Sequence, residues 1–383
     1  MTSHMVSAVS GAAQVEALLP EWEDLFSSTA TTNVFAHPRW LLTWARYFTQ
    51  PQELFVITVR NGSDLVGVAP FYRRTFGLGR TSPVTFLQLL GAGKRAHLTE
   101  LPAVLTHPAW RRSILREIFH HLEKNEPTWD WVEVTLAPEQ GWFEPEWLPT
   151  VEGRPSSVAI HKATRPCVIL PLAASWEETA GDLKRNVRES IRRGVNRLTR
   201  DGHSWRLAVG GRDVPLDYAF KTLTSLHTAR AELRLKPHHQ ELLADSRDIR
   251  FLSDVTQRLS ALGHVMPCLL LVDERPVAAR MLLRAGDAVY FFVSGSDPQW
   301  WEQGVGATLM VECLKQSIGA GCRTANLSTG VDVSKLRWSE TLELYQDFAV
   351  VRGRRRSRAA FAAYWQVRAA TIVRRERAMR GLG

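Results

Sequence analysis

The sequence predicts an α/β protein made of two similar domains, each with a mixed β-sheet flanked by helices. The main observation is a pattern that occurs twice, as LFVITVRNGSDLVGVAPF at residues 54–71 and as CLLLVDERPVAARMLL at residues 268–283. Each copy has an apolar β-rich run, a short polar turn and a second β-rich run that opens with valine. Two similar hairpins more than 200 residues apart indicate that one domain was duplicated.

The elements around the first hairpin complete the first domain. Apolar residues recur every three or four positions in predicted helices at 15–26, 38–48 and 110–123. Predicted strands follow at 84–90 and 129–136. The polar stretch 154–164 and the Arg165-Pro166 pair place the boundary near residue 165, so the domains are 1–165 and 166–383.

The second domain opens with a strand at 168–172 and a helix for which Ser175 and Glu178 form a capping-box pattern. A basic helix follows at 183–198, with cations around its apolar stripe. Further helices are predicted at 218–233, 250–262 and 306–319, and strands at 288–293, 324–327 and 343–351. A second basic helix at 352–380 ends the chain.

Length and composition limit the classes of protein to which the chain can belong. With 383 residues, 45% hydrophobic and 23% charged, the chain is typical of a soluble globular protein of two domains. Of its 48 Lys+Arg and 39 Asp+Glu, residues 1–165 hold 15 and 16, which leaves 33 and 23 for the remainder. All the excess positive charge therefore lies in the second half. This excess charge has two explanations of equal weight. The basic residues either lie on solvated faces or bind an anionic partner such as coenzyme A, a carrier protein or tRNA.

The cysteines and the hydropathy pattern favour a cytoplasmic protein. Four cysteines lie in apolar or helical contexts without CxxC spacing, which argues against a zinc site or a disulfide framework. No stretch reaches the ~18 apolar residues of a membrane span, and no basic segment followed by an apolar run begins the chain. We therefore expect no metal, no membrane association and a reducing compartment.

A glycine-bearing loop at Gln303-Gly304-Val305-Gly306-Ala307-Thr308 lies between a predicted strand and a predicted helix. Such a loop exposes backbone N–H groups at the positive end of the helix, where pyrophosphate binds readily. This order of elements resembles the second domain of the GNAT superfamily of N-acyltransferases, in which a Gln/Arg-x-x-Gly-x-Gly/Ala loop grips the coenzyme A pyrophosphate. Gln303 and Gly306 fit that loop, whereas Thr308 replaces its final small residue.

A second segment resembles particular families within this superfamily. Gly330-Val-Asp-Val-Ser-Lys335-Leu-Arg-Trp338 is similar to the Gly-x-x-x-Tyr-Lys-x-x-Trp segment of the CelD/BcsL acyltransferases and looks like the Phe-Lys-x-x-Phe segment of the Fem-type aminoacyl-tRNA-dependent transferases. Residues 183–193 and Leu226-His227-x-x-Arg230 look like two further motifs of this group. The resemblance spans roughly residues 35–350 and implies a tandem double GNAT-like fold.

Amide synthesis suggests roles for individual residues. The amine must be neutral when it attacks, and the carbonyl oxygen of the donor becomes an oxyanion. Lys335 is expected to stabilise that oxyanion or to hold donor phosphates, His227 to accept a proton, and Asp332 to orient Lys335 or to act as base. Tyr290 is a candidate proton donor to the leaving group. The residues expected to bind the donor are Arg188, Arg192, Arg193, Ser294, Gln303, Gly304, Gly306 and Trp338.

The leading hypothesis is an N-acyltransferase that joins an acyl group from acyl-CoA or an acyl-carrier-protein thioester to an amine acceptor, either a small molecule or a peptide. Coenzyme A would be a co-substrate, with no tightly bound cofactor. The alternative is a Fem-like transferase that uses aminoacyl-tRNA, which the basic second half and the altered glycine loop favour. A non-catalytic protein that binds nucleic acid through its basic domain ranks last, because no aromatic stacking residues interleave its basic runs.

Overall fold

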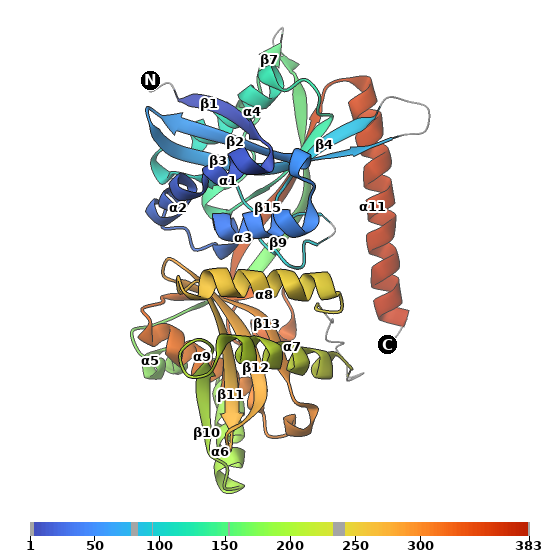
Figure 1. Cartoon of the computed structure of the whole chain (residues 1–383). Coiled ribbons are helices and arrows are strands. Elements are labelled where there is room, and N and C mark those ends of the chain that lie inside the picture. The colour runs from blue at the N-terminus through green and yellow to red at the C-terminus, as the bar shows by residue number, and fades with distance from the viewer. Residues whose placement is uncertain (1–3, 78–82, 94, 152–153, 233–241, 382–383) are drawn as a thin grey trace. The chain divides into compact units, whose positions relative to one another are not determined.

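The computed structural model describes residues 4–77, 83–93, 95–151, 154–232 and 242–381 (Figure 1). The chain forms two compact units. The first unit comprises Met1–Thr29, Trp44–Arg165 and Leu344–Gly383, and the second comprises Ala30–Thr43 and Pro166–Glu343. Helix α3 (Pro38–Phe48) and strand β9 (Ser157–Pro171) contribute residues to both units.

The first unit contains one part of a 13-stranded mixed sheet formed by the described residues. In spatial order its strands are β1 (Met5–Ser10), β2 (Leu54–Asn61), β3 (Asp64–Phe76), β4 (Val84–Leu89), β6 (Trp131–Leu136) and β15 (Thr341–Arg352). Neighbours pair antiparallel except β4 and β6, which are parallel. The short strand β5 (Leu105–Thr106) pairs with β3, and β7 (Thr150–Val151) pairs with β8 (Arg154–Pro155).

The second unit repeats this plan. Its strands lie in the order β10 (Trp205–Val209), β11 (Val265–Val272), β12 (Arg275–Ala285), β13 (Ala288–Ser296), β14 (Thr324–Thr329) and the end of β9. Here too all neighbours are antiparallel except one pair, β13 and β14. Both units therefore have an antiparallel meander followed by a helix and a parallel strand, as the predicted duplication requires.

The two hairpins share an irregularity as well as a pattern. In the first, the register shifts between Val59 and Arg60, so that Val66 on the opposite strand is passed over. In the second, it shifts between Leu270 and Leu271, and Val277 is passed over. A β-bulge at the same distance from the turn in both copies supports the predicted duplication of one hairpin.

The turns of these hairpins use different residues. Gly62 adopts φ +62° in the first turn. The second turn lacks glycine, and both Asp273 (φ +48°) and Glu274 (φ +62°) adopt positive φ. Local contacts compensate for this strain, because the Asp273 carboxylate accepts hydrogen bonds from the Ser204 N–H at 2.9 Å and the His203 ring at 2.6 Å.

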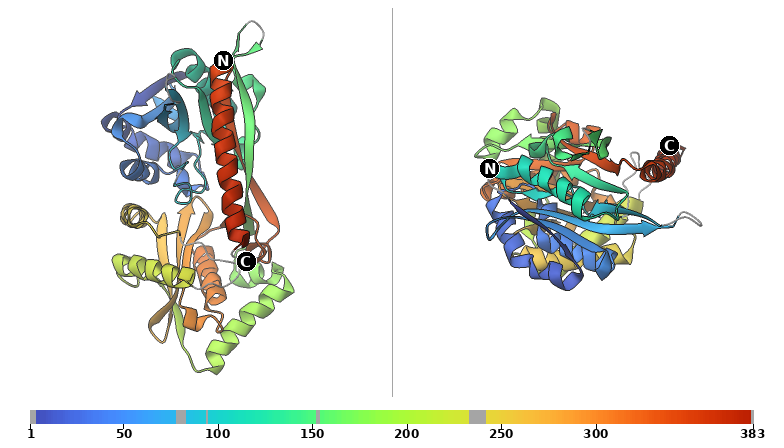
Figure 2. Two further views of the ribbon diagram at one scale, coloured as in Figure 1. Left: turned by 90° about the vertical axis from the view of Figure 1, so that its right-hand side faces the viewer. Right: turned by 90° about the horizontal axis from the view of Figure 1, so that it is seen from above.

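Helices cover both faces of each sheet. In the first unit, α4 (Arg111–Asn125) packs on β2 and β3, while α1 (Ala12–Ala17) and α2 (Leu19–Ser28) contact these strands from the other side (Figure 1). In the second unit, α7 (Leu216–Glu232) and α8 (Ser246–Ser260) cover one face and α9 (Val305–Gly319) covers the other (Figure 2). Helices α5 (Trp176–Asp182) and α6 (Arg185–Arg200) pack on the α9 side.

Two sequence-based assignments need correction. The polar stretch 154–164 was used to place a domain boundary near residue 165, yet β9 runs through most of it and continues to Pro171. Leu344–Gly383 was assigned to the second domain but groups with the first unit. The reason is that β15 pairs with β6, and Phe361 and Tyr364 of α11 (Arg355–Gly381) pack on Trp131.

Candidate functional site

The sheet of the second unit opens between its two parallel strands. β13 and β14 pair only through Ala288↔Thr324, Val289↔Ala325 and Tyr290↔Asn326. Beyond these residues, β13 continues to Ser296 and β14 to Thr329 without further pairing to each other. The ends of both strands stay paired on their outer edges, to β12 and β9, but not with each other. Ligands commonly bind outside the carboxyl ends of parallel strands.

The glycine loop precedes α9 directly. Gly304 is the N-cap of this helix with φ +72°, and no side chain caps the helix. A side chain at Gly306 would meet nothing within 4 Å, so the first turn is open at that position. The Gln303 side-chain oxygen is enclosed and has no hydrogen-bond partner. This loop therefore presents the uncapped N–H groups of a helix N-terminus, together with an amide side chain whose oxygen remains unsatisfied.

Helix α6 lies against the glycine loop. A Cβ atom on Gly304 would be 3.4 Å from the Gly194 Cα, so the two backbones approach closely. Arg197 donates a hydrogen bond to the Glu302 carbonyl. Arg193 precedes Arg197 by one helical turn and therefore lies on the same side of α6. The structure thus brings the predicted basic helix to the predicted donor loop.

The predicted donor-binding arginines of α6 are exposed. Arg188 donates to the Gly181 carbonyl at 2.9 Å. Arg192 and Arg193 make no ion pair in the part of the chain that the structure describes. The apolar stripe faces inward as expected, with Val187, Gly194 and Leu198 buried. These cations are consequently available to an anion.

Lys335 and Asp332 form one compact turn after β14. Asp332 caps the short helix α10 (Val333–Leu336) by accepting a hydrogen bond from the Lys335 N–H at 3.2 Å. The Lys335 ammonium donates to the Thr329 carbonyl and lies 3.6 Å from the Asp332 carboxylate. Partial burial raises the pKa of Asp332, but the hydrogen bond from Ser334 and the charge of Lys335 bring it below its usual value. Asp332 is therefore a carboxylate at neutral pH.

The end of this turn is also tied to α6. Trp338 and Leu336 pack on the same hydrophobic core of the second unit as Ile191 of α6. Lys184 donates to the Leu336 carbonyl at 3.2 Å and pairs with Glu340. Helix α6 thus contacts the Lys335 segment at its beginning and the glycine loop at its middle, which places both candidate segments along one helix.

His227 is a buried, fully hydrogen-bonded histidine. Its Nδ1 lies 2.8 Å from the Ser294 carbonyl, which can only accept, and its Nε2 accepts from the Leu242 N–H at 3.0 Å. These contacts fix the neutral tautomer with the proton on Nδ1. In this arrangement His227 positions β13 and has no free nitrogen with which to take a proton from a substrate.

Tyr290 lies on the opposite face of β13 from the α9 loop. Its ring is buried and meets Phe35 edge-on at 5.1 Å, in a cluster that includes Phe292. The structure therefore does not bring Tyr290 to the same face as Gln303 and Gly304.

Two arginines near Ser294 were not assigned a role from the sequence. Arg230 of α7 donates to the Ser294 hydroxyl at 3.2 Å. Arg280 of β12 pairs with Ser294 across the strand ladder, and its guanidinium lies 5.3 Å from the Phe291 ring. For Arg280, the sequence did carry a signal, because it is a lone arginine inside the apolar strand VAARMLL.

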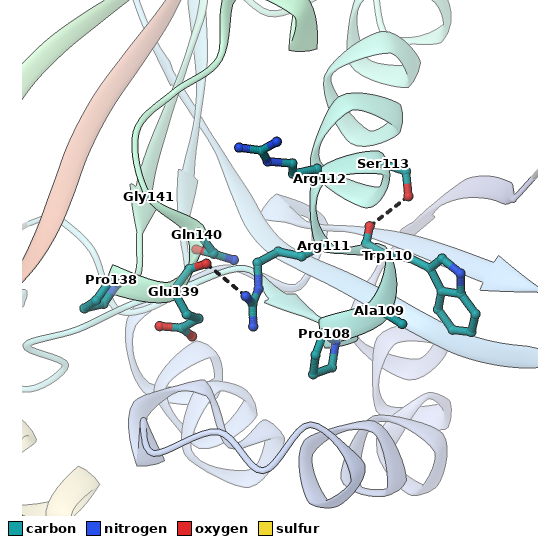
Figure 3. Close-up of a pocket in the computed structure, with 10 residues that line it drawn as sticks. All are labelled: Pro108, Ala109, Trp110, Arg111, Arg112, Ser113, Pro138, Glu139, Gln140 and Gly141. Atoms are coloured by element: carbon teal, nitrogen blue, oxygen red, sulfur yellow. Dashed lines mark hydrogen bonds between the residues drawn. The ribbon is translucent and has the colours of Figure 1, made fainter.

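A separate pocket of about 590 Å³ lies in the first unit, at the N-terminus of α4 (Figure 3). Figure 3 shows Arg111 reaching across it to the Glu139 carbonyl, at 2.9 Å. None of the residues predicted from the sequence lines it. α4 occupies the same place in the first unit that α9 occupies in the second, between two parallel strands.

Residues 185–338 match the family model for an acetyltransferase (GNAT) domain. The open strand pair and the loop before α9 lie within the matched region. No protein of curated function matches the chain.

A solved structure shares the fold over most of the chain, and two others are reported with lower TM-scores. The C-terminal domain of a candidate lysylphosphatidylglycerol synthetase from Agrobacterium fabrum is 11% identical, with a TM-score of 0.51 over 91% of this chain and 96% of that one. L-PGS from Bacillus licheniformis is 10% identical (TM-score 0.49, 90% and 94% covered), and FemX is 9% identical (TM-score 0.49, 77% and 87% covered). At these identities the likeness concerns the fold.

Two searches of the described residues bear on membranes and metals. No helix there is long and apolar enough to cross a bilayer. Nor do any three His, Cys, Asp or Glu side chains among them gather as metal ligands would.

Proposed function

We propose that this protein is an N-acyltransferase that transfers an acyl group from a phosphate-bearing thioester donor to a primary amine, forming an amide. The observation that carries the proposal is the opening between β13 and β14 beside the uncapped N-terminus of α9. A donor whose phosphates bind at the helix N-terminus can extend its acyl end along the free edge of β13.

Donor recognition would use three kinds of group. The N–H groups of the Gly304–Gly306 turn would bind the phosphates, and the open position at Gly306 leaves room for their close approach. The unsatisfied Gln303 oxygen could accept a hydrogen bond from the donor. Arg192 and Arg193 would neutralise the outer negative charge.

The chemistry needs no covalent enzyme intermediate. The neutral amine attacks the thioester carbonyl, a C–N bond forms, and the carbonyl oxygen becomes an oxyanion. When this intermediate collapses, the C–S bond breaks, the thiolate leaves and takes up a proton, and the amine nitrogen loses one. Lys335 would stabilise the oxyanion, with Asp332 holding the ammonium in place. The conversion is therefore a direct transfer.

Aminoacyl-tRNA remains a second candidate donor, and a specific observation favours it. Arg192 and Arg193 are exposed and unpaired, and the exposed Arg188 is held only by a carbonyl, so α6 presents a row of cations along one helix. A row of this kind suits the phosphates of a long polyanion better than a single pyrophosphate.

The test is transfer activity measured in parallel with acetyl-CoA, an acyl-carrier-protein thioester and aminoacyl-tRNA, each with a panel of amines. Mass spectrometry of ligands that co-purify with the protein would guide the choice of acyl group. Binding of tRNA should weaken steeply with salt, whereas coenzyme A should show a shallow dependence. Failure of all three donors to bind or to react would refute the proposal.

A further inference from the structure

Two half-buried arginines of the second unit, Arg230 and Arg280, lie near each other, and no carboxylate of the described residues pairs with them. Arg230 comes from α7 and Arg280 from the middle of β12. Ser294 connects them, since its hydroxyl accepts from Arg230 at 3.2 Å and it pairs with Arg280 across the ladder. Cross-strand partners of this kind have Cβ atoms only ~5 Å apart.

The guanidinium of Arg280 is enclosed and poorly satisfied. Its Nε is buried without a hydrogen-bond partner, although the residue as a whole keeps part of its surface exposed. Burial, and then the neighbouring Arg230 charge, lower the pKa of Arg280 to about 10. Burial also lowers the pKa of Arg230. Both remain charged at neutral pH, so two like charges lie near each other at a cost in desolvation and repulsion.

The surrounding side chains do not balance this charge. No described carboxylate pairs with either arginine. The nearby thiol of Cys268 is neutral, because its hydrogen bond with Cys313 and its burial raise its pKa well above the usual value. The Phe291 ring beneath Arg280 offers only a weak electrostatic attraction.

A buried structural arginine in the same protein, Arg352, also has a buried Nε without a hydrogen-bond partner, but its terminal nitrogens are well satisfied. In the first unit, the terminal nitrogens of Arg352 donate to the carbonyls of four residues, Leu122, Glu123, Glu126 and Pro127. Its side chain also lies 3.8 Å from the Glu123 carboxylate. For Arg280 the described residues offer no such acceptor, which leaves the guanidinium able to bind an anionic ligand.

We propose that Arg230, Ser294 and Arg280 form a binding site for one oxyanion group of a substrate, a carboxylate or a phosphate. The two guanidiniums supply paired N–H donors, and the Ser294 hydroxyl, while accepting from Arg230, keeps its own hydrogen free to donate. The site lies on β13 beyond Tyr290, where pairing with β14 has ended. The inference rests on the proposed function, because it adds a substrate-recognition element to the same strand opening.

The test compares anion binding by the full chain and two variants. Arg280→Met removes the charge but keeps an unbranched apolar side chain. Arg275→Gln removes an exposed arginine from the same strand and serves as the control. Inorganic phosphate and acetate are titrated separately in chloride-free buffer, with affinity read by calorimetry and thermal stability by melting temperature. Neither readout needs acyl transfer, so a failure here is distinguishable from failure of the proposed function.

The wild-type protein and Arg275→Gln should bind at least one of the two anions, and Arg280→Met should bind it about tenfold or more weakly, the loss expected for a charge-assisted hydrogen bond. A response to phosphate alone identifies a phosphate group, and one to acetate alone a carboxylate. Without anions, Arg280→Met should melt at the same temperature as wild type or higher, because an unbalanced charge has been removed. Equal anion affinity in wild type and Arg280→Met, or no binding to either, would overturn the proposal.

Discussion

Replacing Lys335 with alanine separates the two tasks that its position allows, fastening the turn after β14 and stabilising an oxyanion. The first task is small in energy. The ammonium donates to one carbonyl and lies 3.6 Å from Asp332, with 21% of its side chain exposed. A charge-assisted hydrogen bond is worth about 1.5–3 kcal/mol and a partly exposed ion pair about 0–1 kcal/mol. The variant should therefore unfold at a moderately lower denaturant concentration and remain folded.

Loss of the second task, stabilising the oxyanion, should have a large effect on the rate of the reaction. Losing one donor to an oxyanion costs about 3–4 kcal/mol, so kcat should fall about 10²–10³-fold while KM for the donor changes little. Steady-state kinetics measure the change in kcat and KM, and urea unfolding measures the change in the free energy of unfolding. Asp332→Asn is the matched control, since it keeps the N-cap but loses the ion pair. A kcat within threefold of wild type would refute the oxyanion role, and a raised KM with normal kcat would assign Lys335 to the donor phosphates instead.

Charge reversal of Arg188 and Arg192 to glutamate should weaken donor binding about tenfold or more and change stability by under about 1 kcal/mol, because both side chains are exposed; unchanged affinity by calorimetry would return them to a purely solvated role. Gly295→Ala should destabilise the protein by about 3 kcal/mol, because its Cβ would lie 2.2 Å from the His227 backbone nitrogen. Gly306→Ala should instead preserve stability in the same thermal scans, since its Cβ meets nothing within 4 Å, yet weaken donor binding. Burial lowers the pKa of His37 from 6.5 to about 3, so the unfolded chain binds the proton more tightly and stability should fall as pH drops through that range, by up to ~1.4 kcal/mol per unit. His37 Nδ1 accepts a hydrogen bond from the Arg39 N–H at 3.1 Å, and the side-chain oxygen in His37→Asn can replace this acceptor. The variant should flatten the slope, and an identical slope would contradict the assignment.

Periodicity was enough to locate most elements of the fold. The prediction for 38–48 coincides with α3, and the helix predicted at 306–319 begins one residue after α9 does. Long amphipathic stretches and hairpins carry their signal locally. β1 and β10 were missed because each is a short strand of 5 or 6 residues whose partner lies far along the chain. The assignment of β15 to the first unit likewise depends on its pairing with the distant strand β6, which no local sequence pattern predicts.

The site was predictable where a motif fixes a local conformation and less so where tertiary contacts decide. Asp332 and Lys335 share one capped turn, so three residues of spacing sufficed to place them together. His227 looked like a free base on a helix, and only its distant partners, Ser294 and Leu242, show that both nitrogens are used. Arg280 drew no interpretation because its lack of a counter-ion is a property of the folded surroundings.

The path of the chain through the two units bears on how the protein is made. The first unit needs Leu344–Gly383, which follows the second unit in the sequence, and the second unit needs Ala30–Thr43, which lies between two segments of the first. Because synthesis runs from the N-terminal side, β6 gains its partner β15 only after the second unit has been made, and its edge waits unpaired while that unit emerges. Expression of residues 1–165 or 166–383 alone would leave each fragment short of a native segment. Neither half of the sequence is therefore a complete folding unit, even though the architecture repeats one arrangement of strands and helices.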